Sequence, residues 1–237
     1  DAAAKDAEVS PDRWPDVRPA VLAAQAETAR ALLADVKKAE TDRDIDQAIL
    51  IRLLTSDIMW VETDSARIPF TGDWGFHAEP IFAAMQTELD SVEAAEAWIA
   101  RLNDVPRYFA DHVDNMRRGI DTGWTAYRDP LETVIDQIRE QVLDDPEDSS
   151  LYAPFLSLPD DMDPAIAARL QAEGRAATVR AIAAYLDVWR FLQIDYRPHL
   201  RQGAGIAALE GGQDVYAAAV EHYTAGAGYT PEDIHRL

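Results

Sequence analysis

The spacing of the histidines shows whether this sequence contains the zinc-binding motif of a zinc-dependent hydrolase. The metal-binding motif of zinc peptidases places two histidine ligands four residues apart on one helix face, with a glutamate beside the first as general base. The chain has five histidines, none with another histidine four residues away: His77, His112, His199, His222 and His235. Pro80 would in addition break the helix that such a motif around His77 needs. The sequence therefore predicts no zinc-binding helix in this chain.

Two acidic groupings have the residue types of other metal sites. Glu232 and His235 have the three-residue spacing found in carboxylate-bridged di-metal proteins, but such sites need a second copy. A helix N-terminus, capped by Thr230 and opened by Pro231, explains the same residues and is the favoured interpretation.

The second grouping surrounds His112. Asp111 and Asp114, with Asp104 and Asp121 nearby, carry the oxygen ligands that a divalent cation prefers. Asp111 and Asp114 share a helix face that His112 does not, so a solvated acidic surface is favoured over a metal site.

Nucleotide and nucleophile motifs fail in the same way. Gly203, Gly205, Gly211 and Gly212 follow no strand and precede no Lys-Ser/Thr pair, which favours a loop between helices over a phosphate loop. There is no Gly-x-Ser-x-Gly elbow and no cysteine. The sequence predicts no catalytic residue, no metal ligand and no cofactor in this chain.

The net charge and the lengths of the apolar runs limit which classes of partner the chain can bind. With 43 acidic and 22 basic side chains the formal net charge is −21, which repels nucleic acid phosphates and anionic lipids. No apolar run approaches the ~20 residues of a membrane span. We expect no nucleic-acid partner and no membrane span, and the sequence leaves a cytoplasmic or an exported location open.

The elements that would position any site are helices. Apolar residues recur at three- and four-residue spacing, and Pro, Gly and Asp mark the ends. Asp129 is predicted to cap one helix, with Pro130 in its first position and Glu132 completing a capping box, and Asp163 caps another that bends near Gly174. The expected helices span residues 19–39, 45–61, 80–89, 92–102, 106–118, 129–143, 163–200 and 213–223, with another starting at 230.

One long loop, residues 62–80, interrupts this pattern. Phe70, Trp74 and Phe76 in it, with Trp60 before it, either pack onto the core or line a substrate groove, and packing is favoured. The polar segment 144–162 is a possible sub-boundary. The predicted fold is all-α, a single helical region over residues 1–237 arranged as an irregular array of long antiparallel helices with one aromatic-rich loop.

Several segments together resemble a known bacterial family, the domain-of-unknown-function family 885. The most specific is the C-terminal one, with Gly211-Gly212, Tyr216 and then residues 230–235 in a Thr-Pro-Glu-Glu-Ile-His pattern, where Asp233 replaces the second Glu. The segments at 13–16, 101–106, 116–123 and 130–137 fit other parts of the family pattern.

This resemblance implies a longer protein. Family members are about twice this length, look like all-helical HExxH zinc metallopeptidases, and carry the zinc motif in their second half. The resemblance implies that this chain is a non-catalytic N-terminal portion forming a wall or lid of the substrate cleft. Zinc is then expected in the missing C-terminal half, which is also its expected partner. Tyr216, Tyr223 and His235 are the candidates for facing the cleft, although core packing and a first helical turn explain them as well.

Two functions follow as competing hypotheses. In the first, the complete protein is a zinc-dependent hydrolase acting on peptides, and this chain is inactive alone. In the second, the chain is a stand-alone helical binding or scaffold module without catalysis. The first also predicts an exposed apolar face, covered by the missing half or by a homodimer.

Overall fold

The protein is all-α, as predicted. The computed structural model describes residues 12–39, 44–72, 74–203 and 205–237. Within these ranges there is no β-strand, and two isolated β-bridges join Phe70 to Gly75 and Tyr127 to Arg201. The α-helices are α1 (Pro19–Lys38), α2 (Asp44–Glu62), α3 (Glu79–Gln86), α4 (Val92–Thr122), α5 (Arg128–Glu140), α6 (Pro164–Phe191), α7 (Gly212–Tyr223) and α8 (Pro231–Arg236).

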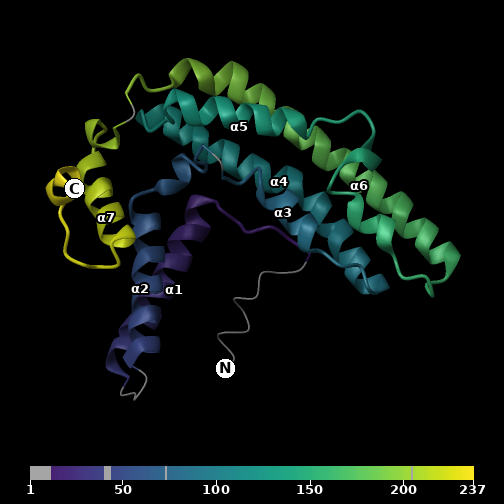
Figure 1. Ribbon diagram of the computed structural model, residues 1–237, viewed down its shortest axis with the longest axis horizontal. Helices are drawn as coiled ribbons and strands as arrows, with labels where there is room; N and C mark the ends of the chain where they lie inside the picture. Colours follow the sequence, from purple (N-terminus) through teal and green to yellow (C-terminus); the bar gives the residue numbers. More distant parts are fainter. Residues whose placement is uncertain (1–11, 40–43, 73, 204) are drawn as a thin grey trace.

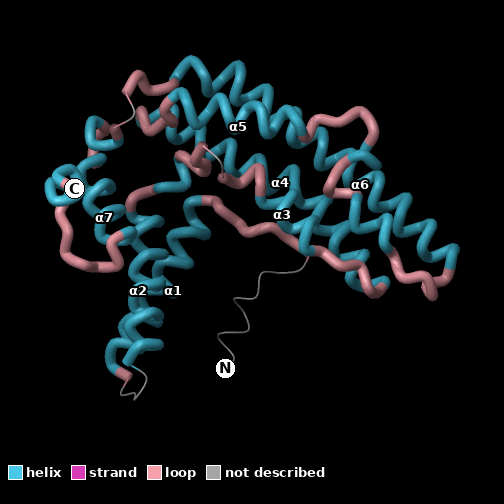
Figure 2. The backbone as a smooth tube through the Cα atoms, in the orientation of Figure 1, coloured by secondary structure: helices cyan, strands magenta, loops and turns pink. Residues whose placement is uncertain are grey.

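The helices form a body and an arm. Helices α3 to α6 pack together as the body, and the antiparallel pair α1 and α2 projects from it (Figure 1, Figure 2). Helix α7 lies against α2, and α8 ends the chain beside α7. None of the described helices is both long and apolar enough to cross a lipid bilayer.

The two longest helices, α4 and α6, run parallel to each other, with α5 antiparallel to both (Figure 1). Contacts advance together along both helices: Glu96 pairs with Arg169, Phe109 packs against Tyr185, and Arg117 lies over Phe191. The cause is α5, which returns the chain along the body in the opposite direction before α6 begins (Figure 1).

Helix α4 also corrects the predicted break at Pro106. A proline inside a helix removes one hydrogen bond and costs about 3 kcal/mol. Nevertheless α4 is a single helix of 31 residues that contains Pro106. The neighbouring Leu102, Val105 and Phe109 are at most 1% exposed. Burial of this apolar face holds the helix together where local preference would end it.

One of the two predicted aspartate caps forms and the other does not. Asp163 caps α6, accepting hydrogen bonds from the amides of Ala165 and Ile166 at 2.7 and 3.3 Å. Asp129 does not cap α5. That helix begins at Arg128 because Tyr127 is held extended by its bridge to Arg201. Asp129 instead accepts a hydrogen bond from the Tyr127 hydroxyl at 2.7 Å.

The helices of the body share one hydrophobic core. Phe70 and Phe76 of the aromatic loop are buried in it, as favoured, while Trp74 remains 44% exposed against Phe82. The segment between α5 and α6 contributes buried residues to the same core, namely Leu151, Tyr152 and Phe155.

Helix α6 is continuous across Gly174, where a bend was predicted. A Cβ at Gly174 would lie 2.5 Å from the ring of Phe155, so this glycine makes room for a buried side chain. Beyond Phe191 the helix loosens into a π-helical turn over Leu192–Tyr196 and a 3-10 turn over Arg197–His199.

Candidate functional site

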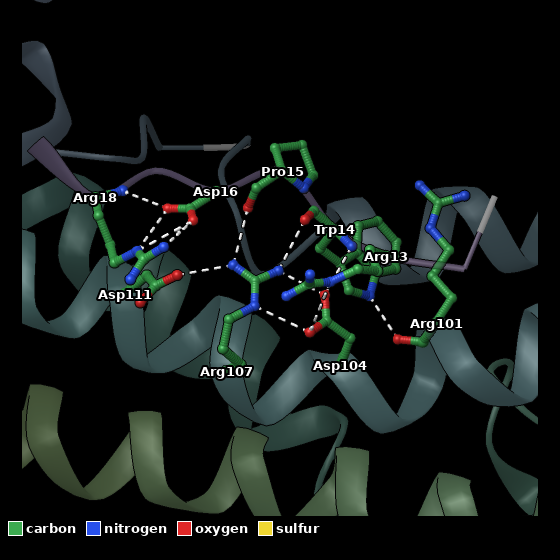
Figure 3. Close-up of polar contacts among 9 residues, drawn as sticks. All are labelled: Arg13, Trp14, Pro15, Asp16, Arg18, Arg101, Asp104, Arg107 and Asp111. Atoms are coloured by element: carbon green, nitrogen blue, oxygen red, sulfur yellow. Dashed lines mark hydrogen bonds and ion pairs between the residues drawn. The ribbon is translucent and has the colours of Figure 1, made fainter. Parts of the chain in front are cut away.

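The acidic grouping on α4 is an ion-pair network around Arg107. Its guanidinium donates hydrogen bonds to the carboxylates of Asp104 and Asp111 at 2.5 and 2.7 Å. It also donates to the backbone carbonyls of Trp14 and Pro15 at 2.7 and 3.2 Å (Figure 3). The Arg107 guanidinium therefore already neutralises Asp104 and Asp111, two of the carboxylates considered as metal ligands.

Electrostatics keep the Asp104 carboxylate charged. Burial acts to raise the pKa of Asp104, but hydrogen bonds from Arg107 and from the Trp14 amide outweigh it, so the pKa is lowered. The hydrogen bonds that Arg107 donates to Asp104, above all, raise the pKa of Arg107 well beyond its ordinary value. Asp114 points elsewhere, pairing with Arg117 on the exposed side of the helix.

His112 belongs to the core. Its ring stacks on Phe76 with centroids 4.5 Å apart and meets Tyr108 edge-on at 4.7 Å. Neither ring nitrogen has a hydrogen-bond partner among the described residues. Burial and, to a smaller extent, the charge of Arg107 lower the pKa of His112 to about 3, so the ring is neutral near pH 7.

The Glu232–His235 segment is a capped helix start. The Thr230 hydroxyl accepts a hydrogen bond from the Asp233 amide at 3.2 Å, and the Asp233 carboxylate accepts one from the Thr230 amide at 3.0 Å. This reciprocal capping box agrees with the favoured interpretation. In the described part of the chain, no group of three or more His, Asp or Glu side chains could hold a metal ion.

The three cleft candidates lie on α7 and α8. The rings of Tyr216 and His235 approach to 5.7 Å between centroids at an interplanar angle of 34°. Tyr223, two turns further along α7, is 78% exposed. The structure thus brings Tyr216 and His235 together and leaves Tyr223 at the surface.

His222 is a residue that sequence reasoning missed. Its Nδ1 lies 2.7 Å from the Ser56 hydroxyl, and its ring meets Trp60 edge-on at 5.4 Å. Arg52 donates a hydrogen bond to the His222 carbonyl. His222 therefore attaches α7 to α2, and no sequence signal identified it because its partners lie some 166 residues away.

A groove opens beside this attachment. It has a volume of about 560 Å³ and runs between α2 and the C-terminal end of α7, with mostly apolar walls. The lining includes Ile45, Ile49, Arg52, Met59, Ala218 and His222. This volume lies within the range of small-molecule ligand pockets.

The glycines before α7 shape a loop between helices. Gly211 has φ 72°, and a Cβ at Gly212 would lie 1.9 Å from the Ile206 carbonyl oxygen. Both positions therefore need glycine for backbone geometry. The turn sets the start of α7 and so places Tyr216 and His222.

Comparisons with known proteins give one family and one fold. Residues 3–237 match the family described as "Bacterial protein of unknown function (DUF885)". No curated protein sequence matches the chain. Among solved structures it is similar to "The crystal structure of the putative lipoprotein from Colwellia psychrerythraea", with a TM-score of 0.80 and 14% identity over 96% of this chain. The match covers 42% of that longer chain.

Proposed function

Since this chain belongs to the bacterial family of unknown function DUF885, we propose that it is the N-terminal helical portion of a longer zinc-dependent hydrolase. In that protein it forms a wall or lid of the substrate cleft, and peptides are the proposed substrates. The observation that carries the proposal is the extent of the structural match. Almost all of this chain aligns with less than half of the neighbour, which leaves room in a related chain for a separate catalytic portion.

The donor groups of this chain support a non-catalytic role. Zinc requires three or four converging His, Cys, Asp or Glu ligands. The chain has no cysteine, and the described residues contain no such group. Asp104 and Asp111 are held by Arg107, and His112 is enclosed by Phe76 and Tyr108. The described residues do not fit a zinc ion, so the proposal places zinc in the rest of the protein.

The α7–α8 segment supports the wall or lid. Tyr216 is half-buried against His235, while His235 and Tyr223 are exposed. Side chains of this kind can contact a peptide through ring faces and hydrogen bonds. The proposal assigns them no metal ligation, so their contribution would be to substrate binding.

The test compares the complete gene product with the 237-residue chain. We expect stoichiometric zinc and peptide hydrolysis from the complete product, and neither from this chain. In the complete product, Tyr216→Ala and His235→Ala should raise KM at unchanged zinc content, because wall residues touch substrate and not metal. Peptide hydrolysis by the 237-residue chain, or a complete product without zinc, would refute the proposal.

A second candidate is a stand-alone binding or scaffold module. The groove between α2 and α7 favours it, since a mostly apolar surface of about 560 Å³ can bind a partner without chemistry. A gene that encodes no HExxH motif downstream of these residues would favour this candidate over the hydrolase.

A further inference from the structure

The arm formed by α1 and α2 does not share the hydrophobic core of the body. None of the described residues of these two helices belongs to that core. The arm has buried residues of its own, namely Ala26 on α1 and Leu54 and Ile58 on α2. A unit with a separate core can move relative to its neighbour, because the motion breaks few apolar contacts.

The two connections between the arm and the body meet α4 at one place. Just before α1 begins, the Val17 carbonyl accepts a hydrogen bond from the Asn115 side-chain amide at 2.8 Å. Just after α2 ends, Asp64 forms an ion pair with Arg118. Arg118 also donates to the Asn115 side chain at 2.7 Å, so the two connections lie side by side. Two adjacent chain crossings of this kind define a hinge axis.

Asp64 lies where the chain passes from the arm to the body. Its φ of 51° falls in the left-handed region, which residues with a side chain seldom adopt. The segment that follows is packed on α4, since a Cβ at Gly119 would lie 3.0 Å from the Arg67 carbonyl oxygen. The Arg67 guanidinium also lies 4.3 Å from the centre of the Trp124 ring. The hinge on the α2 side is therefore confined to the residues around Asp64.

Helix α7 contacts the arm further along α2, through His222. The Nδ1 atom of His222 lies 2.7 Å from the Ser56 hydroxyl, and its ring meets Trp60 edge-on at 5.4 Å. The Arg52 guanidinium donates a hydrogen bond to the His222 carbonyl. These contacts all involve one residue of α7, so one or two substitutions can remove them.

The body in turn holds α7. The Trp124 indole donates a hydrogen bond to the Glu210 carbonyl at 3.1 Å, just before α7 begins. The same indole lies under the Arg67 guanidinium, beside the hinge. A continuous series of contacts therefore runs from the body through α7 to α2, and it bypasses the hinge.

We propose that the arm is a hinged lid, and that the contacts of His222 latch it in the position shown in Figure 1. The hinge lies at Val17 and Asp64, and loss of the His222 contacts lets the arm rotate there while the body keeps its fold. The inference rests on the proposed function only for the word lid, because it makes the arm the moving part of the wall that encloses substrate. Motions of such lids are absorbed by a few residues at the ends of helices.

Pulsed EPR distances in the 237-residue chain test the latch. The chain has no cysteine, so Lys37→Cys near the outer end of α1 and Asn103→Cys on α4 would carry the only two spin labels. Both positions are exposed. We expect one narrow distance distribution in this labelled chain. Adding Arg52→Ala and His222→Ala should widen the distribution roughly twofold or more, since a freed unit samples a range of hinge angles.

His199→Ala is the matched control. His199 is an exposed histidine on the turn after α6 and takes no part in the contacts between α7 and α2. Its replacement should leave the distance distribution unchanged. Hydrogen exchange of α4 distinguishes release of the arm from unfolding, because no described residue of the arm lies in the core of the body. The amides of α4 should exchange at the same rate in all variants.

The outcomes separate this inference from the proposed function. A narrow distribution in the Arg52→Ala, His222→Ala variant would overturn the latch, because the hinge contacts alone would then fix the arm. A broad distribution without these two substitutions, or broadening together with faster exchange in α4, would overturn it as well. The measurement needs neither zinc nor peptide, so a complete gene product without zinc would refute the hydrolase and leave the hinged arm standing.

Discussion

Two buried histidines flank Phe76 in the core of the body. His112 stacks on the Phe76 ring, and His77 meets it edge-on at 5.8 Å. The Nε2 atom of His77 lies 2.8 Å from the Gln137 side-chain oxygen. Burial lowers the pKa of both histidines, that of His112 to about 3. Both rings are therefore neutral in the folded protein near neutral pH.

These shifts predict loss of stability in mild acid. Unfolded histidine has a pKa of about 6.5. Below that pH the two histidines are protonated in the unfolded chain but remain neutral in the folded protein. Stability is then complete above about pH 6.5 and falls as the pH drops towards 3. His112→Phe should reduce this slope by up to about 1.4 kcal/mol per pH unit. Urea unfolding at pH 7, 6 and 5 measures it.

The control for this prediction is His235→Gln on α8. His235 is exposed, so its replacement should leave the slope at the value of the unchanged protein. A His112→Phe variant with the same slope as the unchanged protein would show that burial of this ring does not drive the acid response.

At the scale of elements, sequence predicted features that depend on near neighbours. Asp163 and Thr230 cap their helices as expected, because a cap involves residues two or three positions away. The predictions of a helix break at Pro106 and of a cap at Asp129 were wrong. Burial of Leu102 and Phe109 keeps α4 continuous through Pro106, and the bridge that holds Tyr127 extended makes α5 begin before Asp129.

The cleft candidates stay a prediction. The resemblance singled out Tyr216, Tyr223 and His235, and the structure brings the rings of Tyr216 and His235 together without showing a cleft beside them. His222 escaped notice because a lone histidine near a helix end has many uses, and only the fold shows Ser56 and Trp60 beside it. Helical periodicity carries no direction, so only the fold shows which of the helices run parallel, as α4 and α6 do.

Gly174 gives a prediction that tests the packing between α6 and the segment before it. In an open helix, Gly→Ala stabilises by about 1 kcal/mol. Here the added methyl would meet the Phe155 ring at 2.5 Å, and that ring is 0% exposed. Gly174→Ala should therefore lower the free energy of unfolding by roughly 1–3 kcal/mol, measured by urea denaturation.

The second substitution Phe155→Leu supplies the check on this prediction. It removes ring atoms next to the new methyl, so Gly174→Ala should cost less in the Phe155→Leu background than alone. Stabilisation by Gly174→Ala alone would mean that the ring moves aside, and that helix preference decides the residue at this position.

At the scale of the whole molecule, the segment before α1 ties the arm to the body. The Trp14 amide donates to Asp104 at 2.8 Å, and its indole donates to the Arg101 carbonyl at 2.8 Å. The Trp14 ring stacks on Tyr108 at 5.4 Å under the guanidinium of Arg101 at 4.0 Å. Arg107 then donates to the carbonyls of Trp14 and Pro15, which closes the connection (Figure 3).

Arg107 is therefore predicted to hold the arm and the body together. Arg107→Gln would remove the cation shared by the carboxylates of Asp104 and Asp111, which are only 13% and 12% exposed, and would leave Asp104 with the more distant Arg13 at 4.0 Å. It would also release the carbonyls of Trp14 and Pro15. We expect a loss of about 2–4 kcal/mol in the free energy of unfolding, with faster hydrogen exchange in α1.

Arg117→Gln is the matched control, since it removes an arginine from the same helix. Its partner Asp114 is 74% exposed, and the Arg117 guanidinium lies 5.1 Å from the centre of the Phe191 ring. Exposed ion pairs and exposed cation–π contacts each contribute less than about 1 kcal/mol. The two variants change the net charge equally, so a difference between them reports the position and not the charge. If both variants lose the same small amount and α1 exchanges at an unchanged rate, then the apolar contacts of Trp14 hold the arm without help from the ion pairs.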